Sequence, residues 1–258
     1  MMGIFRAMVG LMKARTAGVL ALALAAAACR GFNPRSYPAP ELLFAASMRQ
    51  FRAGHFDRAL AGFQQVTYDV PGRDTLMPIA RFYLAESHFG EQDLFTAARE
   101  FRRVADEYPT HQLAPQALLR AGDAYAALWR RPELDPSHGQ TAVATYQELQ
   151  GRFPGSQPAG VAGVRLLEIN EQFAAKEYQT GLFYYRRRFY DSGIIYFRNL
   201  IATYPNTTLV PAAFVKLVES YRAIGWREEE QETCQTLRQY YAQRADVREA
   251  CGDGSLRR

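Results

Sequence analysis

The sequence feature that most constrains the fold is a spacing of three residues that recurs four times. Each copy has a small residue, an aromatic residue four positions later and a proline eight positions after the ring: Ala59/Phe63/Pro71, Ala97/Phe101/Pro109, Ala142/Tyr146/Pro154 and Gly193/Phe197/Pro205. Small residues let two antiparallel helices approach closely, a ring fills the space between helix pairs, and proline ends the second helix. Four copies in register therefore predict a stack of helical hairpins.

The residues upstream of three copies complete a known repeat pattern. A small residue is followed three positions later by a ring at Ala85/His88, Gly122/Tyr125 and Gly181/Tyr184. The combined pattern resembles the tetratricopeptide repeat. A fifth pair keeps Tyr221 and Gly225, but it has Cys234 in the ring position and no closing proline, as a terminal repeat often does. We expect an all-α tetratricopeptide-repeat solenoid of about five helix pairs, with one long helix between Pro158 and Arg188 opening the fourth pair.

The first 28 residues have the features of a secretory signal peptide. A basic stretch ending at Arg15 precedes an apolar run of 13 residues, and Cys29 follows it. That run is too short to cross a bilayer core of about 30 Å, but it suits a signal peptide with a small-residue cleavage site. The run into Cys29 resembles the lipobox of bacterial lipoproteins, which implies acylation of the Cys29 thiol. Because Ala26 stands where that motif usually has Leu, a secreted protein with an incidental Cys29 is the alternative.

The prolines after Cys29 predict the organisation of the mature chain. Pro34, Pro38 and Pro40 disfavour a helix, so residues 29–40 are expected to form an extended tether that holds the folded body roughly 30 Å from the bilayer. The remaining boundaries are N-terminal repeats 1–3 at 41–157, C-terminal repeats 4–5 at 158–243 and a C-terminal tail at 244–258.

Charge and motif content argue against nucleic-acid binding and catalysis. The formal net charge is +5, but three of the cations lie in the signal segment, which leaves 28 basic against 26 acidic residues. Nucleic-acid binding needs a stronger and more clustered charge. His55, His88, His111 and His138 have no metal-ligand spacing, and there is no phosphate-binding glycine loop or nucleophile elbow. We expect no enzyme, no cofactor and no metal site.

Two cysteines remain in the mature chain besides Cys29. Cys234 and Cys251 lie 17 positions apart, and in an oxidising compartment they can form a disulfide that ties the tail to the last helix. The alternative is that Cys234 is a free, buried small hydrophobe.

The first helix of each pair should line the concave side of the solenoid, where partner peptides usually bind. Counting from the small-residue positions, the expected peptide-groove residues are Phe44, Met48, Phe51 and Arg52 in the first repeat, and Phe82, Glu86 and Phe89 in the second. Rings and a methionine suit an apolar or aromatic peptide, and Arg52 suits a carboxylate. The alternative is that several of these side chains pack as core between repeats.

Four segments together resemble one family of lipoproteins. They are YPTHQ at 108–112, DPSHGQTA at 135–142, RFPGSQ at 152–157 and the stretch 176–207. With the lipoprotein-like start and the long fourth-repeat helix, they are similar to the BamD (ComL) family, over roughly residues 42–241. The Cys234/Cys251 pair and the acidic stretch 228–232 depart from that pattern.

The resemblance implies a lipid-anchored scaffold on the periplasmic face of the outer membrane. Its C-terminal repeats would bind the barrel-forming subunit of the β-barrel assembly machinery, with other assembly lipoproteins as further partners. Its N-terminal repeats would recognise unfolded outer-membrane protein clients, whose terminal segment often ends in an aromatic residue. The alternative is another envelope repeat lipoprotein, for pilus assembly or for coordinating division with the cell wall.

Overall fold

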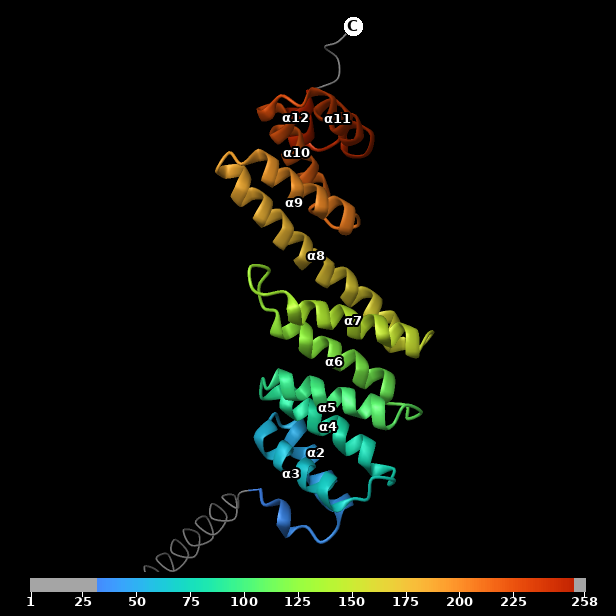
Figure 1. Cartoon of the computed structure of the whole chain (residues 1–258). Helices are drawn as coiled ribbons and strands as arrows, with labels where there is room; N and C mark the ends of the chain where they lie inside the picture. The colour runs from blue at the N-terminus through green and yellow to red at the C-terminus, as the bar shows by residue number, and fades with distance from the viewer. Residues whose placement is uncertain (1–31, 253–258) are drawn as a thin grey trace, which may run out of the picture.

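The computed structural model describes residues 32–252, and their regular structure is helical (Figure 1). In chain order the elements are η1 (Pro34–Ser36), α2 (Pro40–Arg52), α3 (Phe56–Asp69), α4 (Leu76–Gly90), α5 (Leu94–Glu107), α6 (Ala114–Leu128), α7 (Ser137–Arg152), α8 (Gln157–Arg186), α9 (Tyr190–Thr203), α10 (Val210–Ile224), α11 (Arg227–Tyr241) and α12 (Ala245–Cys251). The expected all-α class is therefore confirmed.

Successive helices pair along an elongated stack. Helices α2–α3, α4–α5, α6–α7, α8–α9 and α10–α11 are the five expected repeats, and each helix packs on the next one in the chain. Figure 1 shows this order directly, with α2 and α3 at one end of the stack and α11 and α12 at the other. The tetratricopeptide-type solenoid is confirmed.

The repeat residues pack as their spacing predicts. Both the small and the aromatic members of the four copies are buried: Ala59, Phe63, Ala97, Phe101, Ala142, Tyr146, Gly193 and Phe197. A Cβ atom on Gly122 would overlap the Tyr146 ring, and one on Gly181 would lie 2.6 Å from Phe197 Cε1. Glycine at these two positions lets the first helix of a pair contact the ring of the second, which explains why the pattern needs a small residue there.

Helix α8 is the long helix expected at the start of the fourth repeat. It has 30 residues, and at 1.5 Å per residue it is about 45 Å long. Ser156 caps its start, because the hydroxyl oxygen accepts a hydrogen bond from the Ala159 amide at 3.3 Å. Its first half packs on α6 and α7, and its second half pairs with α9. One continuous helix therefore joins the first three repeats to the last two (Figure 1).

An aromatic column joins the third and fourth repeats across α8. Trp129, at the end of α6, is 1% exposed and lies 4.4 Å, between ring centroids, from Phe173 of α8. Phe173 in turn stacks on Tyr204 at 5.9 Å. Lys176 of α8 also donates hydrogen bonds to the carbonyl oxygens of Pro132 and Leu134, at 3.2 and 3.1 Å. The segment between α6 and α7 is thus held against the long helix.

The N-terminal segment differs from the expected extended tether. Within its described part, residues 34–36 form a short 3-10 helix that packs on α3. Phe32 and Tyr37 are half-buried against the core cluster that contains Leu43 and Val66. Two aromatic side chains drive this contact, because docking removes them from water. The prolines of this segment predicted an extended tether, but burial of its two aromatic rings docks the segment on the first repeat.

The segment expected as a C-terminal tail also contains ordered structure. Residues 245–251 form α12, whose Val247 and Ala250 are buried against α10 and α11. Helix α12 therefore covers the exposed end of the fifth repeat, as capping helices do in solenoids.

Candidate functional site

The expected groove residues of the first repeat belong to an aromatic cluster centred on Tyr83. We use "aromatic cluster" for Phe44, Met48 and Phe51 of α2, Phe63 of α3 and Tyr83 of α4. The Tyr83 ring lies 6.2 Å from Phe44, 5.5 Å from Phe51 and 5.8 Å from Phe63, between centroids. Phe44, Met48, Phe51 and Tyr83 are half-buried. They hold the first two repeats together and still present part of each side chain to solvent.

Arg52 is exposed at the last position of α2. Within residues 32–252 it forms no ion pair with another side chain. A guanidinium group in this state can donate hydrogen bonds to a partner's carboxylate without first breaking an internal ion pair. The carboxylate-binding role expected of Arg52 stays a prediction.

Phe82 does not line a groove, and this corrects the expectation. Its side chain is 7% exposed and belongs to the core cluster with Ala97, Phe101 and Ala121. Its ring lies 5.4 Å from that of Phe101. The alternative, that a helical ring packs between repeats, holds at this position. The adjacent Tyr83 faces the aromatic cluster instead, and it escaped prediction because the repeat pattern marks Ala85 and His88 and assigns no role to position 83.

Glu86 and Phe89 are both engaged by Arg120 of α6. Arg120 donates from Nε to Glu86 Oε1 and from Nη2 to Oε2, both at 2.7 Å. The same guanidinium lies 4.1 Å from the centroid of the Phe89 ring. Burial alone would lower the pKa of Arg120, but its hydrogen bonds to Glu86 and Asp123 raise it above the usual value. Glu86 is thus already paired within the protein, and one face of Phe89 is covered by a cation.

The pairing continues along the first helices of repeats two to four. Arg120 Nη1 lies 3.3 Å from Asp123 Oδ2, and Asp123 Oδ1 lies 3.3 Å from Arg165 Nε. Arg165 also pairs with Glu168 at 2.8 Å. Tyr146 donates to Asp123 at 2.9 Å, and burial together with this carboxylate raises the pKa of the Tyr146 hydroxyl well above its usual value. We call this row, from Glu86 to Glu168, the ion-pair row.

The fourth repeat exposes large apolar side chains. Phe183 of α8, Phe189 in the α8–α9 turn and Ile195 of α9 are all solvent-exposed. Arg187 lies over the Phe183 ring at 3.6 Å from its centroid. Phe183 contacts Tyr184, which stacks on Tyr196 of α9. An apolar surface beside the cations of residues 186–188 has a composition typical of a protein contact.

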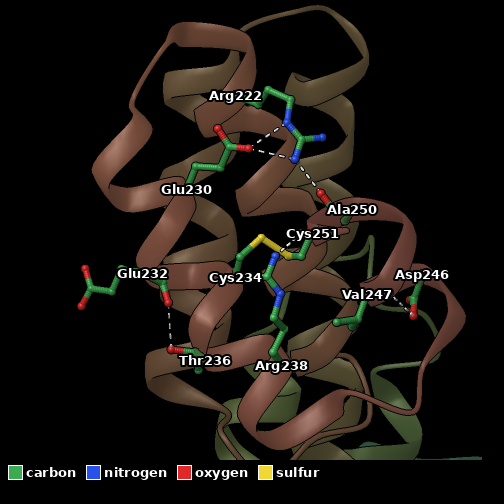
Figure 2. Close-up of a disulfide and its surroundings, with 10 residues drawn as sticks. All are labelled: Arg222, Glu230, Glu232, Cys234, Thr236, Arg238, Asp246, Val247, Ala250 and Cys251. Carbon is green, nitrogen blue, oxygen red and sulfur yellow. Dashed lines mark hydrogen bonds and ion pairs between the residues drawn. A yellow bond between two sulfur atoms is a disulfide. The ribbon is translucent and has the colours of Figure 1, made fainter. Parts of the chain in front are cut away.

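The C-terminal end contains a disulfide between Cys234 and Cys251 (Figure 2). The two Cα atoms lie 5.5 Å apart, within the range that disulfides need. Around it, Arg222 pairs with Glu230 at 2.8 Å and donates to the Ala250 carbonyl at 2.5 Å, while Arg238 donates to the Cys251 carbonyl. Figure 2 shows these groups gathered around the disulfide. The bridge joins α11 to α12 and so fixes the cap of the solenoid.

Two other sequence predictions bear on membrane and metal binding. Cys29, the expected acylation site, lies outside the described residues. Across residues 32–252 no helix combines the length and the apolarity that a membrane crossing requires. Over the same stretch, no group of three or more histidine, cysteine or carboxylate side chains could bind a metal ion.

The described chain is a helical-repeat solenoid with half-buried rings at one end, a class of protein that binds other polypeptides. Residues 38–237 match the family described as outer membrane lipoprotein (YfiO), and the chain belongs to this family. The similarity to BamD proteins is thereby confirmed, and the family is one of non-catalytic scaffolds.

The curated relatives are distant. Outer membrane protein assembly factor BamD of Caulobacter vibrioides is 24% identical over 197 residues, which cover 73% of this chain and 62% of the relative. The chain thus spans less than two thirds of that relative's length. BamD of Neisseria meningitidis serogroup A is 24% identical over 225 residues, covering 80% of this chain and 82% of the relative.

Two of the solved structures that this chain matches are repeat proteins. A tetratricopeptide-repeat protein of Thermus thermophilus is 18% identical, with a TM-score of 0.38 over 82% of this chain and 96% of that one. The TPR2AB domain of yeast Sti1 is 12% identical, with a TM-score of 0.43 over 82% of this chain and 81% of that one.

Proposed function

We propose that this protein is the lipid-anchored scaffold of an outer-membrane β-barrel assembly complex. In this proposal Cys29 is acylated, and the anchor holds the solenoid on the periplasmic face of the outer membrane. The family match over residues 38–237 supports the outer-membrane location. The names of the BamD relatives, outer membrane protein assembly factors, support the role in assembly. The same names favour this role over pilus assembly or division.

The aromatic cluster is the proposed site for unfolded outer-membrane clients. Its half-buried rings and Met48 offer an adaptable apolar surface, and Arg52, which has no ion pair within residues 32–252, lies at the end of the same helix. A client segment that ends in an aromatic residue and a carboxylate would place its ring among these side chains and its charge on Arg52. The observation that carries this assignment is that rings and an exposed cation occur together on α2.

The exposed surface of the fourth repeat is the proposed contact for the barrel-forming subunit. Phe183, Phe189 and Ile195 are large apolar side chains left in solvent, and Arg187 adds a cation beside them. Such residues are enriched in protein interfaces. The two sites lie on different repeats, so one scaffold can hold a client and the barrel subunit at once.

A peptide-binding measurement tests the client site. The probe is a synthetic peptide with the last strand of an outer-membrane β-barrel protein and a free carboxylate. We expect Met48→Ala with Phe51→Ala to weaken its binding about tenfold or more, because both changes remove side-chain surface that the aromatic cluster presents to solvent. The matched control is Phe95→Ala, an exposed ring on α5 outside the aromatic cluster. Unchanged affinity, with helicity retained, would rule out this site.

A cellular measurement tests the process. Depleting the protein should lower the amounts of folded porins in the outer membrane. Normal porin levels together with defective pili or division would favour the alternative lipoprotein role instead.

A further inference from the structure

The segment between the proposed lipid anchor and the first repeat is docked on the folded body. We call residues 32–39 the docked segment. Phe32 and Tyr37 are half-buried in the first-repeat core, with ring centroids 6.0 Å apart. The Phe32 ring lies over Gly62 of α3, where a Cβ atom would come within 2.9 Å of it. The stretch of chain between Cys29 and the docked segment therefore ends at Phe32.

The reach of the remaining chain is short. Three residue steps separate Cys29 from Phe32, and at 3.3–3.6 Å per residue they span at most about 11 Å. We propose that the first repeat rests directly on the phospholipid surface, at the level of the headgroups, instead of standing away from it. This inference rests on the proposed acylation of Cys29, and it specifies how the anchored scaffold is placed.

We use "flank" for the part of α2 and α3 that adjoins the docked segment, and its side chains are suited to contact with a phospholipid surface. Leu42 of α2 is 55% exposed and Tyr68 of α3 is 86% exposed. Each precedes a residue, Leu43 or Asp69, that lines a cleft of about 250 Å³ together with residues 37–40. Tyrosine is favoured at membrane–water interfaces, and an exposed leucine gains by entering the apolar boundary.

The charges near this flank indicate which kind of bilayer surface it would contact. Exposed Arg35 and Arg73 are outnumbered by the carboxylates of Glu41, Asp69 and Asp74. The flank therefore has no net attraction to anionic lipid, and the contact depends on the anchor and on apolar side chains. We expect it to form on zwitterionic vesicles at least as well as on vesicles that also contain anionic lipid.

Lipid-quenching fluorescence on the full-length acylated protein tests the proposal. Tyr68→Cys is labelled with a small fluorophore, and the protein is bound to phosphatidylethanolamine–phosphatidylcholine vesicles that contain headgroup spin labels. Tyr240→Cys is the matched control, because Tyr240 is 68% exposed on α11 at the other end of the stack. We expect quenching at position 68 to be at least several-fold stronger than at position 240.

A second variant separates docking from anchoring. Phe32→Ala with Tyr37→Ala should undock the segment and reduce quenching at position 68 to the control level, while vesicle flotation stays unchanged. Equal quenching at positions 68 and 240 in protein that floats with the vesicles would overturn the membrane contact but leave the anchor intact. Protein that does not float would contradict both the contact and the proposed acylation.

Discussion

The disulfide at the C-terminal end leads to a quantitative prediction about α12. The perturbation is Cys234→Ala with Cys251→Ala, which removes the bridge without introducing a buried hydroxyl. The two cysteines are 17 residues apart, and closing a loop of that length lowers the chain entropy of the open state, which raises its free energy by about 3 kcal/mol at 25 °C. Helix α12 has seven residues, too few to persist alone in water. Its docking therefore depends on the bridge and on a few contacts.

The contacts that remain without the bridge are identifiable in the structure. Val247 and Ala250 stay buried against Val215, Val218 and Leu237. Arg222 still donates to the Ala250 carbonyl. These groups keep α12 docked for most of the time, so we expect more frequent opening rather than complete loss of the helix.

Hydrogen exchange at the α12 amides measures this opening. A loss of about 3 kcal/mol corresponds to exchange about 150-fold faster for residues 247–251, because 1.36 kcal/mol is one factor of ten. Amides of α4 and α6 should be unaffected, since each repeat in a solenoid contacts only its neighbours. Reducing the wild-type protein with dithiothreitol should reproduce the acceleration, whereas the double variant should not respond to the reductant.

Two outcomes would refute this reasoning. One is unchanged α12 exchange in the double variant. The other is unchanged exchange in wild-type protein whose thiols are shown by mass analysis to be reduced. Either result would mean that packing alone keeps α12 docked, and that the disulfide does not contribute the expected stabilisation.

Two further predictions concern the core, and thermal unfolding measures both. Gly122→Ala should lower the free energy of unfolding by about 1–3 kcal/mol, because its Cβ would overlap the Tyr146 ring. Gly160→Ala, in α8 with open space around it, should be neutral or stabilising by up to about 1 kcal/mol. Equal effects of the two changes would contradict the argument that Gly122 is needed for close packing. Trp129→Ala should lower the free energy of unfolding by about 3–5 kcal/mol, since the ring is fully buried against Phe173. Leu134→Ala, in the segment between α6 and α7, should cost less than about 1 kcal/mol because Leu134 is exposed. A small loss at Trp129 would show that the aromatic column does not stabilise the junction of the third and fourth repeats.

The repeat pattern predicted the fold because it records contacts within each hairpin. A small residue and a ring four positions later lie on one face of a helix, so their spacing in sequence is also their spacing in space. Gly122 contacts the Tyr146 ring and Gly181 contacts the Phe197 ring, so the same pattern also predicted which residues of the two helices in a pair touch. The length of α8 followed from the lack of a helix breaker after Gly163.

The parts that the sequence did not predict depend on contacts between distant residues. Phe32 docks on α3, and α12 docks on α10 and α11. Neither contact leaves a periodic signal, because one segment is short and rich in proline and the other has only seven residues. Similarly, the choice between Phe82 and Tyr83 as the buried ring depends on where α5 and α6 lie, and the helix pattern alone does not specify that.

The ion-pair row limits where a client can bind on the solenoid. A carboxylate approaching the middle repeats would have to displace Glu86 or Asp123 from Arg120, which leaves a part-buried carboxylate without its partner. Such a loss typically costs more than a new surface pair contributes. Arg52, at the first repeat, carries no such cost. In the proposed binding mode the client's terminal carboxylate is therefore directed to the first repeat, which is also the repeat that we propose to lie against the lipid. The client's last strand would then be held close to the membrane surface.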